Sequence, residues 1–272
     1  MARDTSNPNA NMQLAYQRLL ALERFKSGFL ARTAHELRSP INTIVSLHQL
    51  ILEDLCEDPA EEKEFLLQSK AAALKMLALF DCVAAVAKLD VGREPPKLAA
   101  VDLSFLLPEV EMLSALQAAN ENVRYSVESP ETEVIVHTDG KWLKNILLSL
   151  IQDAIAHTKV LRLAVESDEQ SDQKTVAVVI ECDRAADDLQ RELDSIADAL
   201  TLFPESETPL VEPNPPLSLA QIENLQLSTG LVLATAAIAL PAIQGEFSIL
   251  PHPTKSGRSR LICAFFTQGH HE

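Results

Sequence analysis

The chain has 272 residues, of which 47% are apolar and 23% are charged, and its formal net charge is −16. This balance is typical of a folded globular protein, and the acidic surplus argues against nucleic acid or an anionic lipid surface as a partner. The four cysteines lie far apart without a Cys-x-x-Cys pair, so they predict neither a disulfide framework nor a zinc site. We expect a cytoplasmic protein with reduced thiols.

The two ends and the longest apolar run contain no targeting or membrane signal. Residues 1–11 have no apolar core and are expected to form a flexible N-terminus. The nearly apolar segment 231–240 ends at Pro241 and is shorter than the roughly 20 residues that a membrane helix needs. No membrane insertion is therefore expected.

The first half of the chain predicts a helical hairpin. Apolar residues recur at helical spacing over residues 12–55, and Asp58 and Pro59 have the pattern of a helix start, which predicts a second helix over about 60–89. The hairpin has a wide apolar stripe that includes Leu37, Ile41, Ile44, Leu74 and Leu77. Either a second copy covers this stripe, giving a homodimeric four-helix bundle, or the rest of the same chain covers it.

The second half predicts an α/β layer structure. Residues 93–100 contain two adjacent prolines and are expected to be a linker, and residues 203–218 are expected to be a mobile loop rich in proline and acid. One segment, 139–157, is helical in pattern, and six segments alternate like strands: 123–129, 133–138, 160–167, 174–182, 245–250 and 259–266. The expected fold class is α+β, with a two-layer sandwich over residues 101–268.

Residues 29–41, "FLARTAHELRSPI", interrupt the first helix with polar chemistry. Pro40 inside a helix removes a backbone hydrogen bond, at a cost of about 3 kcal/mol. His35 supplies a nucleophilic imidazole, and the adjacent Glu36 can hold or accept its proton. A lone His-Glu pair is more often an ordinary exposed pair on a helix, so a functional role is indicated only by the whole stretch.

The whole stretch resembles the phosphoacceptor box of two-component histidine kinases. The resemblance implies that residues 12–92 form a dimerisation and phosphoacceptor domain, and that His35 attacks the γ-phosphate of ATP. It further implies that His35 passes the phosphoryl group to an aspartate in the receiver domain of a response regulator, with Glu36 as the base and Ser39 in a phosphatase role. Too few residues precede the hairpin for a sensor domain, so a separate sensor protein is a candidate partner.

The resemblance continues into "VHTDGKWLKNILLSLIQDAIAHT", which is similar to the family's nucleotide-binding asparagine box, but key residues differ. Ser149 and Asp153 stand where the family has asparagines, and Ala156 stands where it has a basic residue. An aspartate can still ligate magnesium. The resemblance therefore implies ATP and Mg²⁺ as cofactors if the protein is active, with Asp153 as a weak metal ligand.

Both glycine boxes of the family are also degenerate. The first is reduced to Asp183, the adenine-recognising position, followed by Ala185 and Asp187 in place of glycines, and the second keeps only Gly230. Glycines let backbone N–H groups approach phosphates closely, and other residues resist this. Asp183 and Gly230 are weak candidates for nucleotide binding.

Three functions stay open from the sequence. The first is a histidine kinase with an unusual ATP site, and the second is a pseudokinase or phosphotransfer and docking protein whose His35 receives phosphate from elsewhere. The third is a structural dimerisation module in which His35 is never modified. ATP binding separates the first from the second, and phosphate on His35 separates both from the third. The sequence names neither the stimulus nor the cognate regulator.

Overall fold

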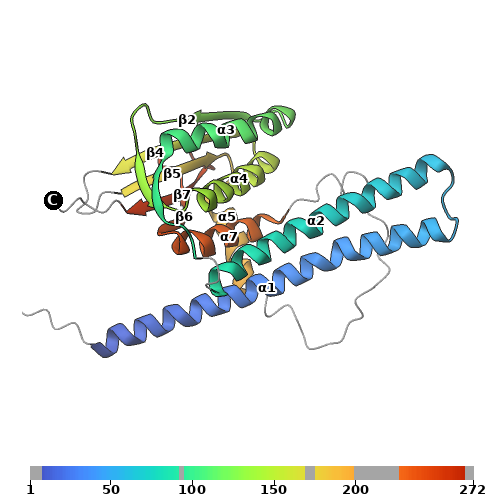
Figure 1. Cartoon of the computed structure of the whole chain (residues 1–272), viewed down its shortest axis with the longest axis horizontal. Coiled ribbons are helices and arrows are strands. Elements are labelled where there is room, and N and C mark those ends of the chain that lie inside the picture. Colours follow the sequence, from blue (N-terminus) through green and yellow to red (C-terminus); the bar gives the residue numbers. More distant parts are fainter. Residues whose placement is uncertain (1–7, 92–94, 169–174, 199–226, 267–272) are drawn as a thin grey trace, which may run out of the picture.

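The computed structural model describes residues 8–91, 95–168, 175–198 and 227–266, and it has the expected α+β fold (Figure 1). The elements in chain order are α1 (Pro8–Leu52), α2 (Pro59–Val91), β1 (Ala99–Asp102), α3 (Leu103–Asn120), β2 (Arg124–Glu128), β3 (Ile135–Thr138), α4 (Gly140–His157), β4 (Val160–Asp168), β5 (Thr175–Cys182), α5 (Ala186–Asp198), α7 (Thr229–Ala242), β6 (Gly245–Pro251) and β7 (Ser259–Phe266). The segment 203–218 lies outside the described residues.

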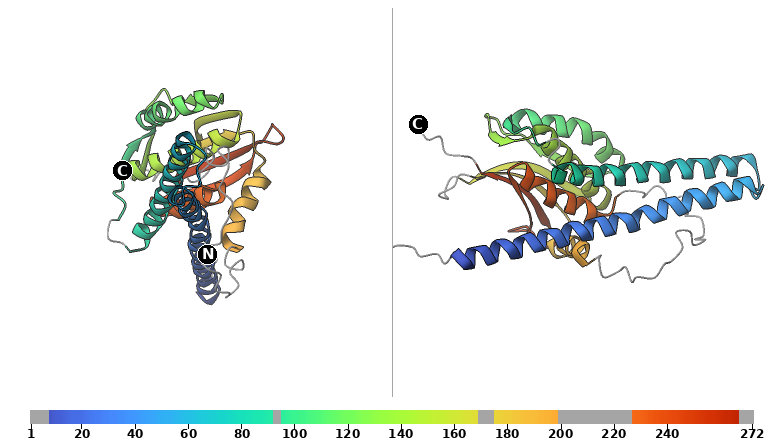
Figure 2. Two further views of the ribbon diagram at one scale, coloured as in Figure 1. Left: turned by 90° about the vertical axis from the view of Figure 1, so that its right-hand side faces the viewer. Right: turned by 60° about the horizontal axis from the view of Figure 1, so that its bottom comes forward.

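Helices α1 and α2 form the predicted antiparallel hairpin. The Asp58 carboxylate accepts hydrogen bonds from the backbone N–H groups of Ala60 and Glu61, at 2.7 and 2.8 Å, and so caps the start of α2. Helix α1 continues through Pro40 without a break in its assignment. The turn between the two helices extends well beyond the second half of the chain (Figures 1 and 2).

The second half builds a five-stranded sheet in the order β2-β4-β5-β7-β6. Strands β2 and β4 are parallel because α4 crosses between them, and the other neighbours in this sheet are antiparallel. Strand β1 pairs with β3 in a separate two-stranded ladder, so Ala99 and Ala100 belong to a strand although they were expected in the linker. Their backbone groups pair with those of Thr138 and His137.

One face of the large sheet is covered by helices. Buried side chains of α3, α4 and α7 pack on it to form one apolar cluster, which includes Leu107, Leu147, Ile151, Leu240 and Phe265. Helix α3 was not predicted, because its apolar residues occur on all sides and give no clear period.

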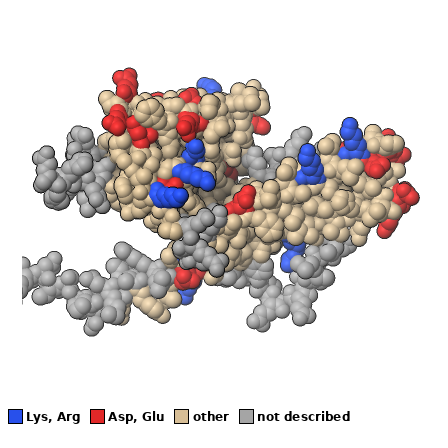
Figure 3. All heavy atoms as spheres, in the orientation of Figure 1, with Lys and Arg blue, Asp and Glu red and all other residues tan. Residues whose placement is uncertain are grey.

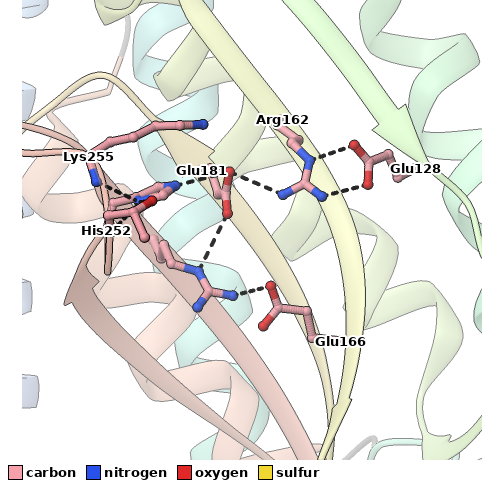
Figure 4. A network of polar contacts seen from close by, with 8 residues as sticks. Glu128, Arg162, Glu166, Glu181, His252 and Lys255 are labelled. Carbon is pink, nitrogen blue, oxygen red and sulfur yellow. Dashed lines mark hydrogen bonds and ion pairs between the residues drawn. The ribbon is translucent and has the colours of Figure 1, made fainter.

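The opposite face of the sheet carries a ladder of charges (Figure 4). Glu181 on β5 lies between Arg162 on β4 and Arg260 on β7, with ion-pair distances of 3.2 and 3.6 Å. Arg162 also pairs with Glu128, and Arg260 with Glu166. Alternation along the strands thus separates an apolar face under the helices from a charged face.

The hairpin and the second half of the chain share a small apolar cluster, the hairpin interface. It contains Phe29, Leu79, Cys82 and Val86 from α1 and α2, and Ile196, Leu231, Ala234 and Ile238 from α5 and α7. Leu37 packs at its edge. The rest of the same chain therefore covers part of the predicted stripe.

Another part of the stripe stays exposed in the single chain. Leu74 and Leu77 are 57% and 58% exposed, and Phe80 is 52% exposed. In the view of Figure 3, charged side chains on the hairpin gather toward the turn between its two helices. Within the described residues, no helix is both long enough and apolar enough to cross a membrane.

Candidate functional site

His35 lies exposed on α1 and faces a cavity between the hairpin and the second half of the chain. The cavity has a volume of about 510 Å³. Its lining residues come from α1, α2, the end of α4 and the start of α7: Arg32, His35, Glu36, Ser39, Lys75, Ala156, His157, Leu227, Ser228 and Thr229. The structure thus brings His35, Glu36 and Ser39 together, one helical turn apart on one side of α1.

Glu36 is held by two neighbours. Arg32, one turn earlier on α1, donates from Nε to its carboxylate at 2.9 Å, and the backbone N–H of Ser228 donates to the other carboxylate oxygen at 3.4 Å. Ser228 is the N-cap of α7, and its hydroxyl accepts from the Leu231 N–H. The start of α7 is therefore anchored directly beside His35.

Asp153 is buried inside the second half of the chain and is fully engaged there. Its carboxylate accepts hydrogen bonds from the Thr229 hydroxyl at 2.8 Å and from the Arg184 guanidinium at 3.3 Å. Burial raises the pKa of this carboxyl, and the Thr229 hydrogen bond and the positive charges of His157 and Arg184 offset part of that rise. The network ties together α4, the segment after β5 and the start of α7.

The remaining predicted nucleotide-site residues also serve internal contacts. Asp183 accepts hydrogen bonds from the backbone N–H of Lys159 at 3.0 Å and from that of Val160 at 3.4 Å, and so holds the start of β4. A Cβ atom at Gly230 would lie only 2.8 Å from the carbonyl oxygen of Glu192, so this glycine permits the close packing of α7 on α5. Ser149 lies two helical turns before Ala156 on α4 and lines a different cavity.

These residues do not fit a cradle for ATP and magnesium. The Arg184 guanidinium pairs with the Asp153 carboxylate that was the candidate metal ligand, and the backbone of α5 lies so close to Gly230 that a side chain there would meet the Glu192 carbonyl oxygen. Within the described residues, no group of three or more His, Cys, Asp or Glu side chains could hold a metal ion.

His157 belongs to the site but was not singled out from the sequence. Its Nδ1 lies 2.8 Å from the Asp153 carbonyl oxygen, one turn earlier on α4, and 3.4 Å from the Asp153 carboxylate. His157 lines the same cavity as His35. The sequence signal was the imidazole directly after Ala156, but only packing brings it to His35.

The sequence comparisons match parts of the chain. Residues 25–92 match the family model described as the His Kinase A (phospho-acceptor) domain. The aerobic respiration control sensor protein ArcB of Escherichia coli K12 is 32% identical over 144 residues, which is 51% of this chain and 18% of ArcB. The cell-division control histidine kinase PdhS of Brucella ovis is 26% identical over 146 residues, or 52% of this chain and 14% of PdhS. The matches thus span less than a fifth of either relative's length.

Two solved structures share the overall fold. The Acinetobacter baumannii histidine kinase AdeS superposes with a TM-score of 0.58 at 15% identity, over 86% of this chain and 98% of that chain. Full-length ShkA, solved in complex with AMPPNP, gives a TM-score of 0.51 at 19% identity, over 88% of this chain and 46% of that chain. At these identities the likeness concerns the fold alone.

Proposed function

The chain belongs to the family of two-component sensor histidine kinases, and from this premise we propose that His35 accepts a phosphoryl group and passes it to an aspartate of a response-regulator receiver domain. The observation that carries the proposal is the exposed His35 beside Glu36 and Ser39, in a cavity that a phosphoryl group can reach. A homodimer through the hairpin and a separate sensor protein are the further expected partners.

The proposed chemistry needs two displacements at phosphorus. A ring nitrogen of His35 attacks the phosphoryl group of a donor, forming a P–N bond while the bond between phosphorus and the donor breaks. An aspartate oxygen of the receiver domain then attacks the same phosphorus, and the P–N bond breaks to return the imidazole. Arg32 and Lys75 line the same cavity and supply positive charge for the phosphoryl oxygens.

The roles of Glu36 and Ser39 follow from their places around His35. Glu36 is proposed to stabilise the imidazole proton while the other ring nitrogen carries the phosphoryl group. In the present arrangement its carboxylate is held by Arg32 and Ser228, so this role requires α7 to release it. Ser39 lies one turn from His35 and is proposed to hold a water or the aspartyl phosphate during dephosphorylation of the regulator.

We further propose that the phosphoryl donor is another phosphorylated protein, because the ATP site is degenerate. The support is the internal engagement of Asp153, Asp183 and Gly230, each of which already contacts protein atoms. Each lost charge-assisted contact weakens nucleotide binding by about 1.5 to 3 kcal/mol, so two or three losses reduce affinity at least a few hundredfold. Autophosphorylation is expected to be slow or absent without a partner.

A phosphotransfer assay tests the proposal. The chain is incubated with radiolabelled ATP and magnesium, either alone or with a labelled phosphorylated histidine kinase and receiver domain. Label should reach the chain in the second reaction and hardly at all in the first. His35→Gln should abolish labelling and leave the circular dichroism spectrum unchanged.

His48→Gln is the matched control, since His48 lies on the same helix and contacts Ser69 instead of the cavity. It should keep full labelling. Acid-labile phosphate on the His35→Gln variant would contradict the acceptor assignment, and rapid labelling by ATP alone would contradict the degenerate site.

A further inference from the structure

A second cavity lies at the joint between the hairpin and the sheet domain. It has a volume of about 840 Å³ and is bordered by α2, the segment 95–97, α4 and α7. It shares no lining residue with the cavity at His35, and it includes Ser149 but not Asp153, Asp183 or Gly230. A small-molecule site of this class typically has a volume of about 300 to 1,000 Å³.

The inner wall of this joint cavity is apolar. Ile146 on α4 and Val232, Ala236 and Ala239 on α7 are buried and present only aliphatic atoms. The indole of Trp142 is half-buried beside them. A flat ring would contact both the aliphatic wall and the indole, and such contacts between an aromatic ligand and a protein are favourable.

The outer wall is rich in hydrogen-bond donors. Lys97 and Lys141 line the cavity, and within the described part of the chain neither ammonium group forms an ion pair or a hydrogen bond. The indole N–H of Trp142 and the side-chain amide of Asn145 are likewise unpaired among the described residues.

The acids at the cavity do not balance these donors. Asp139 is already used: its carboxylate accepts from the backbone N–H groups of Lys97 at 2.7 Å, Lys141 at 3.0 Å and Trp142 at 3.1 Å, because it caps α4 and holds the segment 95–97. Asp81 on α2 is the other acid at the cavity. A cationic ligand would meet two ammonium groups here, whereas an anion would meet one free carboxylate.

We propose that the joint cavity binds a small aromatic anion, with its ring between Trp142 and the α7 wall and its acid group toward Lys97 and Lys141. Asp81 and Ala84 belong to the hairpin, and the other lining residues follow it in the chain. A bound ligand therefore favours the arrangement in which the sheet domain is docked on the hairpin. This inference does not depend on phosphate transfer by His35.

The chain contains a single tryptophan, so Trp142 gives one indole N–H resonance that reports on the cavity directly. The probes are naphthalene-2-carboxylate and the uncharged naphthalene-2-carboxamide, added separately to the full chain. We expect a saturable shift of the indole resonance with both probes. The carboxylate should bind more tightly than the carboxamide, by up to about fivefold for each lysine that pairs with it, since an exposed ion pair contributes up to about 1 kcal/mol.

Lysine variants distinguish probe binding at this cavity from non-specific binding to the protein surface. The double variant Lys97→Ala with Lys141→Ala should reduce carboxylate affinity to that of the carboxamide. The control is Lys144→Ala, one turn away on α4, because Lys144 pairs with Glu109 and does not line the cavity. It should leave both affinities unchanged.

A third variant blocks the cavity from inside. Ala236→Phe places a ring against the wall of α7 and should abolish the shift with both probes, while the circular dichroism spectrum reports whether it folds. The proposal is overturned by the absence of a saturable shift in the parent chain, by equal affinities for the two probes, or by an equal loss in the Lys144→Ala control. The lysine variants decide the matter if Ala236→Phe does not fold.

Discussion

At the scale of residues, the chemistry of the site depends on which groups are exposed and on what each carboxylate contacts. His35 is exposed, whereas the Glu36 carboxylate is held by Arg32 and Ser228. Asp153, which stands where the histidine kinase family has an asparagine, is buried and paired with Arg184. A buried carboxylate at this position, unlike an amide, needs a positively charged partner, and Arg184 is that partner.

Arg184→Ala should destabilise the fold by leaving Asp153 without its positive partner. We expect the free energy of unfolding at neutral pH to fall by about 1 to 3 kcal/mol in denaturant titrations. Arg191→Ala is the matched control, because Arg191 forms an exposed pair with Asp188 on α5 and should change stability by at most about 1 kcal/mol.

The destabilisation by Arg184→Ala should also depend on pH. Because burial raises the pKa of Asp153, the folded state keeps this proton to a higher pH than the unfolded state does, so the carboxyl subtracts from stability as pH rises above its ordinary pKa. The penalty of Arg184→Ala should therefore be smaller at about pH 4 than at about pH 7. The double variant with Asp153→Asn should lose this pH dependence. If the pH dependence persists in the double variant, a group other than Asp153 causes it.

The cysteines should differ sharply in reactivity. Burial raises the pKa of Cys263 to about 12, and burial also raises the pKa of Cys82 and Cys182, so their thiolates are scarce. Cys56 is only half-buried, although desolvation and the nearby acids, led by Glu61, raise its pKa too. Iodoacetamide should label Cys56 slowly and first, with the other three reacting only after denaturation. Mass spectrometry showing early labelling of Cys263 would contradict the packing of β7.

At the scale of elements, the hairpin has two apolar surfaces. One side of α1 and α2 packs on α5 and α7 through Phe29, Leu79 and their neighbours. The other side leaves Leu74, Leu77 and Phe80 exposed in the single chain. An apolar surface of this kind on a helix pair needs a partner, which supports the predicted homodimer.

Leu77→Asp should separate the predicted dimer. An unpaired charge in an apolar seam costs about 2 kcal/mol or more, and the change occurs twice in a symmetric dimer. Light scattering at micromolar concentration should show a dimer for the parent chain and a monomer for the variant. Leu116→Asp on α3, at a residue that is 73% exposed and outside the hairpin, should remain dimeric. If Leu77→Asp remained a dimer, the dimer interface would not include Leu77.

At the scale of the whole molecule, the hairpin interface joins the two halves next to His35. Its apolar members come from α1, α2, α5 and α7, and the Ser228–Glu36 hydrogen bond lies at its edge. The sheet domain is thus docked close to His35, the residue proposed to exchange a phosphoryl group with a receiver domain. Release of this interface would break the Ser228–Glu36 hydrogen bond beside His35.

Phe29→Ala should weaken the coupling between the two halves. Phe29 is fully buried, and the loss of its ring should lower the free energy of unfolding by about 3 to 5 kcal/mol. Calorimetry should show one transition for the parent chain and two for the variant, because the hairpin and the sheet domain then unfold separately. Leu30→Ala, at a neighbouring residue that is 52% exposed, should keep the single transition. Two transitions already present in the parent chain would contradict the coupling.

The sequence by itself determined the elements and the phosphoacceptor motif, because both depend on neighbours along the chain. Helical spacing located α1 and α2, alternation located β4, β5 and β7, and His35 lies within one short motif. Helices α3, α5 and α7 and strand β1 were not predicted: β1 begins in the expected linker, and the apolar residues of α3 and α7 occur on all sides of the helix.

Only the tertiary structure decided what the candidate site residues contact. The Glu36–Ser228 and Asp153–Thr229 hydrogen bonds join residues 192 and 76 positions apart, and His157 reaches the cavity at His35 because α4 packs beside α7. Such contacts depend on how whole helices pack, and packing is set by side-chain volumes summed over many elements instead of by any local pattern. For this reason only the folded chain shows that Asp153 and Asp183 accept hydrogen bonds from other elements and that α7 approaches α5 closely at Gly230.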